Sequence, residues 1–243
     1  MPPRKKKSIR SEAYLEVSAQ AEEEILEAYS IILGEEEQDF YLHQLIELYD
    51  YLKIPSCFTA DFKRCIDYYY EFIRPNTELE FDATNVKHYT TLNFIHAFTI
   101  TGKINKLNMI IDIIDIDKLI RNSNRLLKFR DNFNHIYQSW EMFVTASTIS
   151  GSSSEINEQF ILNYKLGMKE LKKIKTDLQL DTDRKTAAVL GDSFLIDMLS
   201  LPTTNERGEI LNFDFNKPKI GLCVTIKDFA EILGNLGELE STD

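Results

Sequence analysis

The residue types that most often carry protein chemistry are present, but their spacing forms no recognised metal site. The histidines are His43, His88, His96 and His135, and the cysteines are Cys57, Cys65 and Cys223. The histidines match neither the HExxH spacing of zinc hydrolases nor the spacing of a zinc finger. An odd number of widely spaced cysteines argues against a disulfide framework and favours a reducing compartment. We therefore predict no metal site.

Acidic pairs and a serine run are the remaining candidates for catalysis. Asp112 and Asp115 form one such pair, and no histidine or metal-binding set stands beside them. The run Ser152–Ser154 is not enclosed by the GxSxG sequence of a nucleophile elbow. Neither GxGxxG nor GxxxxGK[ST] occurs, so the chain lacks the usual phosphate-binding loops. We expect a protein that is not an enzyme and that has no cofactor.

One segment has the layout of a calcium-binding loop between two helices. It runs from Leu33 to Gln44. Such a loop needs oxygen ligands at its first, third, fifth and twelfth places and a glycine at its sixth. Glu35 and Glu37 hold the third and fifth places, and Phe40 holds the apolar eighth place. The first, sixth and twelfth places hold leucine, glutamine and glutamine. The loop therefore keeps its length and apolar residue but has lost the ligands for calcium.

Three further segments repeat this phasing without the ligands. The segment 74–85 has Phe81 at the eighth place but begins with an arginine. Around Val224 and Leu166 the apolar eighth place is followed by an acid at the twelfth place, Asp228 and Glu170 respectively. We interpret the four segments as degenerate helix–loop–helix units whose loops pair through the eighth residue. The alternative is that helix pairs with short links arise by chance in any all-α bundle.

The elements that position these loops are predicted to be helices. Apolar residues recur three and four positions apart, the spacing of one helix face. The expected helices cover residues 21–33, 42–52, 59–73, 85–99, 129–144, 167–180, 182–199 and 225–236. The stretch 104–127 is ambiguous, because its isoleucines favour strands, and we assign it as helix. No alternation of strands and helices is visible, so the predicted fold class is all-α.

The charge of the chain limits its partners. It has 28 basic and 39 acidic residues. Five of the basic residues stand among the first ten without an acid, so the remainder carries 23 basic against 39 acidic residues, a net charge of −16. A body this acidic repels phosphate, so we expect no direct nucleic-acid binding. We also expect no membrane association, because no apolar stretch is long enough for a span. The Lys5–Lys7 run is either a nuclear import signal or a solubilising tail.

The pattern divides the chain into an arm and two lobes. The predicted parts are a disordered basic arm at 1–20, an N-terminal lobe at 21–101, a helical inter-lobe linker at 102–128 and a C-terminal lobe at 129–240. The C-terminal lobe carries insertions at 145–160 and 202–221.

Several segments resemble the calmodulin and centrin family. EEEILEAYSII…LHQLIELYDYLKIP (Glu22 to Pro55) resembles the first hand, ELEFD (Glu78 to Asp82) the second loop exit, and MKELKKIKTDLQL and VTIKDFAEILGNLG the third and fourth exiting helices. Within that family, the pattern without calcium ligands is similar to that of a small nucleotide-excision-repair protein of yeasts. That protein is a centrin-like companion of the xeroderma pigmentosum group C type damage-recognition factor. The chain departs from the family in its longer middle, its serine-rich insertion and its loop at 202–221.

This resemblance implies two lobes of paired, degenerate EF-hands and a binding function. We expect a calcium-independent adaptor in nucleotide excision repair that binds and stabilises the damage-recognition factor by gripping an amphipathic helix. It would work in the nucleus, with the cytoplasm as a second location. The alternative is a myosin-light-chain-like or cytoskeletal centrin-like clamp on a basic IQ-type helix.

The partner-binding groove is predicted in the C-terminal lobe. Its lining residues are Ile136, Trp140, Phe143, Leu171, Phe194, Met198, Phe229, Ile232 and Leu233. Trp140 is the best single anchor, because its indole N–H needs a hydrogen-bond partner when buried. The alternative for every one of these residues is plain core packing.

Overall fold

The computed structural model describes residues 12–34, 38–76, 85–101, 110–148, 157–177 and 223–239, with side chains from residue 14. The helices are α1 (Glu12–Leu15), α2 (Ala19–Leu33), α3 (Leu45–Tyr51), α4 (Ser56–Tyr68), α5 (Val86–Phe98), α6 (Ile116–Asp131), α7 (Phe133–Thr148), α8 (Glu158–Asn163), α9 (Met168–Asp177) and α12 (Ile226–Asn235). A 3₁₀ turn, η1 (Leu42–Gln44), precedes α3, and a π-helical turn, η2 (Tyr69–Ile73), ends α4. Within the described ranges the only strands are β1 (Leu166–Gly167) and β2 (Cys223–Val224), so the all-α class is confirmed.

Side-chain caps set where several helices begin. Ser18 accepts a hydrogen bond from the backbone N–H of Ala21 at the start of α2, at 3.1 Å. Asn85, Asp115 and Thr225 cap α5, α6 and α12 in the same way. Each cap satisfies a backbone N–H that has no partner within the helix, which fixes the first turn.

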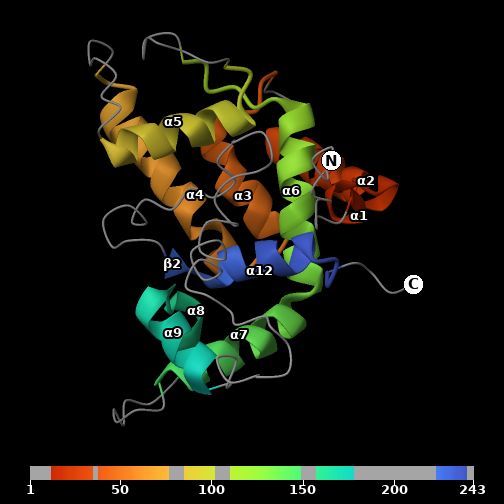
Figure 1. The fold of residues 1–243 in the computed structure, drawn as a ribbon. Helices are drawn as coiled ribbons and strands as arrows, with labels where there is room; N and C mark the ends of the chain where they lie inside the picture. The colour runs from red at the N-terminus through yellow and green to blue at the C-terminus, as the bar shows by residue number, and fades with distance from the viewer. Residues whose placement is uncertain are drawn as a thin grey trace, which may run out of the picture.

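The helices form two groups joined across the middle of the molecule. Helices α4 and α5 pack together, and α6 runs beside them before the chain turns into α7 (Figure 1). Helices α8 and α9 lie beside α7 at the opposite end from α5, and α12 lies across the middle, in contact with both α7 and α4. The core between α4, α5 and α6 is largely aromatic and includes Phe58, Phe62, Phe94, Phe98 and Phe129. Among the described helices, none is long and apolar enough to cross a membrane.

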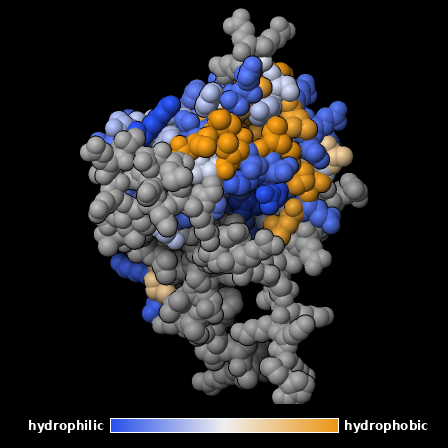
Figure 2. Space-filling model, turned by 90° about the horizontal axis from the view of Figure 1, so that it is seen from above, coloured by the Kyte–Doolittle hydropathy of each residue, from blue (hydrophilic) through white to orange (hydrophobic). Residues whose placement is uncertain are grey.

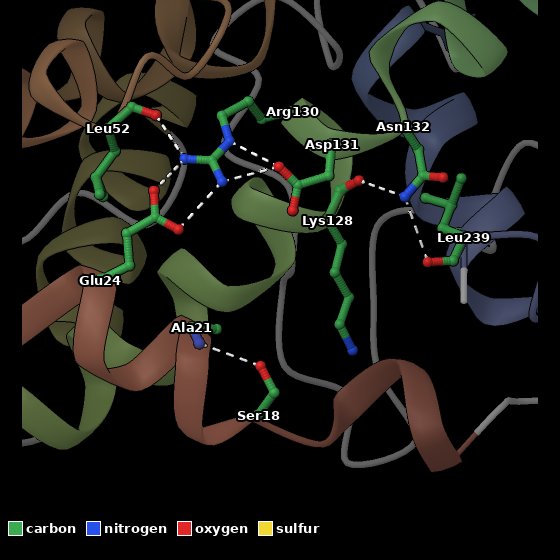
Figure 3. A network of polar contacts seen from close by, with 9 residues as sticks. All are labelled: Ser18, Ala21, Glu24, Leu52, Lys128, Arg130, Asp131, Asn132 and Leu239. Atoms are coloured by element: carbon green, nitrogen blue, oxygen red, sulfur yellow. Dashed lines mark hydrogen bonds and ion pairs between the residues drawn. The ribbon is translucent and has the colours of Figure 1, made fainter. Parts of the chain in front are cut away.

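The polar contacts of Arg130 fix the junction between α6 and α7 (Figure 3). Its guanidinium pairs with both carboxylate oxygens of Glu24 on α2, with Nη2 3.1 Å from Oε2, and donates to the carbonyl oxygen of Leu52 at 2.9 Å. Two residues on, the amide of Asn132 donates to the carbonyl oxygens of Lys128 and Leu239. The α6–α7 turn is therefore hydrogen-bonded to α2, to the end of α3 and to the segment that follows α12.

The predicted helical linker at 102–128 is helical from residue 116 onward, whereas the described residues before it are not helical. Residues 113 and 114 form bridges with Tyr41 and Thr99, and α6 begins only at Ile116. Helix α6 buries Leu119, Leu126 and Leu127 against the body, so it is a central core helix. The reason is its apolar stripe, which pairs with α2 and α5 instead of bridging solvent.

The predicted arm at 1–20 and the insertion at 145–160 also differ from the structure. Helix α1 packs on α6, with Tyr14 fully buried and the Lys128 ammonium donating to the carbonyl oxygens of Tyr14 (2.8 Å) and Glu16 (3.1 Å). At the insertion, α7 continues to Thr148 because Val144 is buried in the core. The Lys5–Lys7 run, residues 149–156 and the loop at 202–221 lie outside the described residues.

Candidate partner-binding site

Three helical segments, η1, α9 and α12, begin with the same hydrogen bond between backbone and side chain. The residue before each helix-opening segment donates its backbone N–H to a side-chain oxygen three positions later. The pairs are Tyr41 N to Gln44 Oε1 (2.7 Å), Gly167 N to Glu170 Oε2 (3.0 Å) and Thr225 N to Asp228 Oδ2 (2.9 Å). Each bond satisfies a backbone donor at a helix start. In the third pair the Thr225 hydroxyl oxygen also accepts from the backbone N–H of Asp228 at 3.2 Å, which completes a capping box.

The loops also meet in pairs through short antiparallel bridges. Leu166 lies opposite Val224, the residue that has the same place in its own loop. In the N-terminal half Tyr41 lies opposite Ile113, with Ile114 N donating to Phe40 O at 2.8 Å. Within the described ranges, the first loop therefore pairs with residues ahead of α6. Phe81, which was expected to make that contact, lies outside the described residues.

The side chains at the twelfth places form hydrogen bonds with the protein backbone. Gln44, Glu170 and Asp228 each accept a hydrogen bond from their own loop. In the loop ahead of α6, counting Ile114 as the eighth place puts Lys118 at the twelfth, and its ammonium donates to the carbonyl oxygens of His96 (2.9 Å) and Thr99 (2.6 Å). A lysine thus supplies a positive charge to carbonyl oxygens at the end of α5. Among the described residues, no cluster of three His, Cys, Asp or Glu side chains forms a metal site.

Trp140 is the centre of the predicted groove residues. Its side chain is fully buried, and its indole Nε1–H donates to the carbonyl oxygen of Ile161 at 2.8 Å. The ring lies 5.6 Å from that of Phe229, which in turn lies 5.3 Å from the ring of Phe143. The hydrogen-bond partner expected for the indole is therefore inside the chain itself.

The structure brings seven of the nine predicted groove residues together between α7, α9 and α12. Ile136, Trp140, Leu171 and Phe229 are buried, and Phe143, Ile232 and Leu233 are half-buried against them. Phe194 and Met198 lie outside the described residues. The seven form a packed core with a half-buried edge; contact with a partner stays a prediction.

Another face of the molecule carries exposed apolar side chains. Ile100, Ile111 and Ile116 are 50%, 49% and 40% exposed. Ile100 follows α5, Ile111 lies in the segment ahead of α6 that bridges to it, and Ile116 is the first residue of α6. Seen from above, the apolar areas on this side are separated by hydrophilic side chains (Figure 2). Among the described residues of this face, they do not form one continuous stripe, which an amphipathic helix would need.

Sequence reasoning missed a buried ionic cluster where α12 meets the N-terminal half. Arg125 Nη1 lies 3.0 Å from Glu231 Oε1, and the Tyr14 hydroxyl donates to Glu231 Oε2 at 3.0 Å. Burial alone would lower the pKa of Arg125, but the Glu231 carboxylate holds it above its ordinary value. Tyr14, Arg125 and Glu231 lie on α1, α6 and α12, so the cluster joins three distant segments.

Lys227, also on α12, is a second buried charged residue that the sequence did not reveal. Its Nζ lies 3.8 Å from the ring centre of Phe62 on α4, and within the described part of the chain it has no hydrogen-bond partner. Burial lowers the pKa of Lys227 to about 8. A charge buried without a partner is costly, because the interior solvates it poorly.

Comparison with known proteins assigns the chain to a family. The model of the Rad33 family matches residues 11–183. The chain belongs to the Rad33 family. No curated protein and no solved structure matches it.

Membership of the Rad33 family connects the chain to nucleotide excision repair. This family role implies a repair factor as partner and work in the nucleus. The match covers both bridged segments of the N-terminal half and extends through α9, so it includes four of the nine predicted groove residues: Ile136, Trp140, Phe143 and Leu171.

Proposed function

We propose that this chain is a non-catalytic adaptor that binds and stabilises the xeroderma pigmentosum group C type damage-recognition factor. It binds an amphipathic helix of that factor at the edge of the cluster between α7, α9 and α12. The family match supports the repair role. Apolar residues at the half-buried edge, Phe143, Ile232 and Leu233, support the place of contact.

The proposal depends on one observation: the loops meet in pairs, and their twelfth side chains bind backbone groups of the protein itself. Helix-flanked loops that meet through short antiparallel bridges are the arrangement of paired EF-hands, which is why we assign a degenerate calmodulin or centrin-like fold. At each described twelfth place the side chain binds the protein backbone, so the bidentate carboxylate that calcium needs there is not available. The adaptor is therefore calcium-independent, because ion binding can shift a conformation only through differential affinity.

A pull-down from nuclear extract tests this function. The full chain is used as bait once with calcium and once with a chelator, and bound proteins are identified by mass spectrometry. We expect the damage-recognition factor in equal amounts under both conditions. Recovery that requires calcium contradicts the mechanism, and recovery of a motor or spindle-pole protein in its place contradicts the partner.

Two neighbouring residues of α7 provide a matched pair of variants. Phe143 is half-buried at the cluster edge, whereas Met142 is 67% exposed. Phe143→Ser should reduce capture of the factor by at least tenfold, and Met142→Ser should leave capture unchanged. Circular dichroism melting of both variants shows whether a loss comes from unfolding. Equal capture by a folded Phe143→Ser protein would place the contact elsewhere.

A further inference from the structure

The beginning of the described chain lies on the rest of the molecule in the way a bound peptide does. Helix α1 is short and packs beside α6 (Figure 1). Within residues 14–18 only Tyr14 is fully buried, whereas Leu15, Glu16 and Ser18 are exposed. One buried aromatic anchor between exposed neighbours is typical of a short segment recognised by a protein surface.

Helix α12 receives both the ring and the hydroxyl group of Tyr14. A Cβ atom at Gly234 would overlap the Tyr14 ring, so the ring lies directly against the glycine. The hydroxyl donates to Glu231 Oε2 at 3.0 Å, while Arg125 pairs with the other carboxylate oxygen. Burial, and then the Glu231 charge, raises the pKa of Tyr14 well above its ordinary value, so the hydroxyl keeps the proton that it donates. This surface therefore selects an aromatic side chain that carries a hydrogen-bond donor.

Helix α6 binds the backbone of the same segment. The Lys128 ammonium donates to the carbonyl oxygens of Tyr14 (2.8 Å) and Glu16 (3.1 Å) and lies 5.6 Å from the centre of the Tyr14 ring. The side-chain amide of Asn124 also donates to the Glu16 carbonyl oxygen, at 3.0 Å. Carbonyl groups are common to all residues, so these bonds hold a segment whatever its side chains are.

The chain's own segment leaves one buried atom of this surface unused. Asn124 is 1% exposed, and within the described residues its Oδ1 has no hydrogen-bond partner. A buried acceptor without a donor is costly. A segment with a donor next to the carbonyl that Asn124 binds would therefore fit this surface better than residues 14–18 do.

We propose that the surface between α6 and α12 is a binding site for a tyrosine-centred peptide segment of a partner protein, and that α1 is its replaceable occupant. This surface, the tyrosine slot, is lined by Asn124, Arg125, Lys128, Glu231 and Gly234. Helix α2 has its own N-cap, Ser18, so its first turn does not require α1 to stay docked. The unused Asn124 acceptor favours a foreign segment over the same segment from a second copy. The inference does not depend on the proposed adaptor function.

The tether of α1 to α2 determines how a competitor can enter the slot. Residues 16–18 join the two helices, and so short a link gives α1 an effective concentration of at least about the millimolar range. A dilute peptide therefore does not displace α1, whereas a partner held by another contact competes on similar terms. Because α1 stays docked at this concentration, the same sequence added in trans should bind an empty slot with a Kd below about 1 mM.

Fluorescence anisotropy with the full chain tests the proposal. Tyr14→Glu places a second carboxylate beside Glu231 and so releases α1 from the slot. The probe is a labelled peptide of residues 10–18, RSEAYLEVS. We expect one peptide to bind per Tyr14→Glu chain and to bind at least tenfold more weakly to the parent chain, whose slot is occupied.

Two further peptides test how the slot recognises tyrosine. A peptide with Tyr14→Phe should bind about tenfold more weakly, because a hydrogen bond to a charged group is lost. A peptide phosphorylated at Tyr14 should not bind, because its phosphate meets the Glu231 carboxylate.

Two second-site variants on α12 form a matched pair in the Tyr14→Glu chain. Gly234→Ala should abolish peptide binding, because its methyl group occupies the place of the ring. Leu236→Ala changes a side chain that is 55% exposed and should leave binding unchanged. Circular dichroism shows that each variant is folded.

Four results would overturn the proposal. The first is no peptide binding by a folded Tyr14→Glu chain at about 1 mM. The second is an equal loss of binding in the Gly234→Ala and Leu236→Ala variants. The third is unfolding of both Tyr14→Glu and the milder Tyr14→Ser, which would make α1 an integral part of the core. The fourth is a dimer of the parent chain that Tyr14→Glu does not form, which would assign the slot to a second copy. If only Tyr14→Glu unfolds, the same binding test is made with Tyr14→Ser.

Discussion

Replacing Lys227 by methionine is expected to stabilise the protein, although it removes a charged residue. The Lys227 pKa is lowered from its ordinary 10.5 to about 8 by burial against Phe62. Methionine has a similar shape and no charge, so it keeps the packing and removes the cost of burying an ammonium. The shift of about 2.5 pKa units corresponds to about 3 kcal/mol at pH 7.

The gain should depend on pH in a defined direction. A folded-state pKa below the unfolded value means that the unfolded chain binds more protons between pH 8 and pH 10.5, so the stability of the native protein rises with pH across that window. The penalty is fully present below pH 8 and disappears towards pH 10.5. The advantage of Lys227→Met should therefore shrink from about 3 kcal/mol at pH 7 to about 2 at pH 9 and about 1 at pH 10.

Urea unfolding of both proteins across this pH range measures the difference directly. Burial also raises the pKa of Cys57 and Cys65, and the Lys227 charge partly opposes that rise, so both thiols are included in the fit for each protein. Lys63→Met, at an exposed site on α4, is the control and should change stability by less than about 0.5 kcal/mol at every pH. A Lys227→Met protein that is less stable than the parent at pH 7, or whose gain does not vary with pH, would refute the reasoning.

Three further predictions concern the buried contacts, each measured as the free energy of unfolding in urea. Trp140→Ala should destabilise the protein by about 3–5 kcal/mol, because it leaves a cavity and removes the indole hydrogen bond; a loss below 1 kcal/mol would contradict its central place in the core. A methyl group on Gly234 would overlap the Tyr14 ring, so Gly234→Ala should cost about 1–3 kcal/mol, and additivity with Tyr14→Leu would argue against that contact. Glu231→Ala should cost about 3–5 kcal/mol by leaving Arg125 buried and unpaired, and a neutral result would show that water reaches the pair.

Much of the local structure could be predicted from the sequence. The apolar periods gave helices near α2, α3, α4, α5, α7, α9 and α12, because each buries a stripe that recurs with the helical repeat. The phasing around Leu166 and Val224 placed both residues at the same position in their loops, and the structure pairs them. The exception is 104–127, where isoleucine-rich sequence serves both a bridged segment and the start of α6.

The candidate site was predicted as a set of residues but not as a surface. Trp140, Phe143, Leu171 and Phe229 do meet, since aromatic residues on three apolar stripes are brought to one core. Which of them are accessible depends on how closely the three helices pack. Periodicity gives the direction of a side chain on its own helix and contains no information on that distance.

The sequence by itself determined the helical class and the loss of calcium ligands, because these depend on residues within one or two turns of each other. The tertiary structure alone decided that Tyr14, Arg125, Lys227 and Glu231 are interior. By sequence they are polar or terminal residues, which an isolated helix would turn to water. They are buried because α12 lies between two groups of helices and is enclosed on several faces, and an enclosure of that kind is a property of long-range packing.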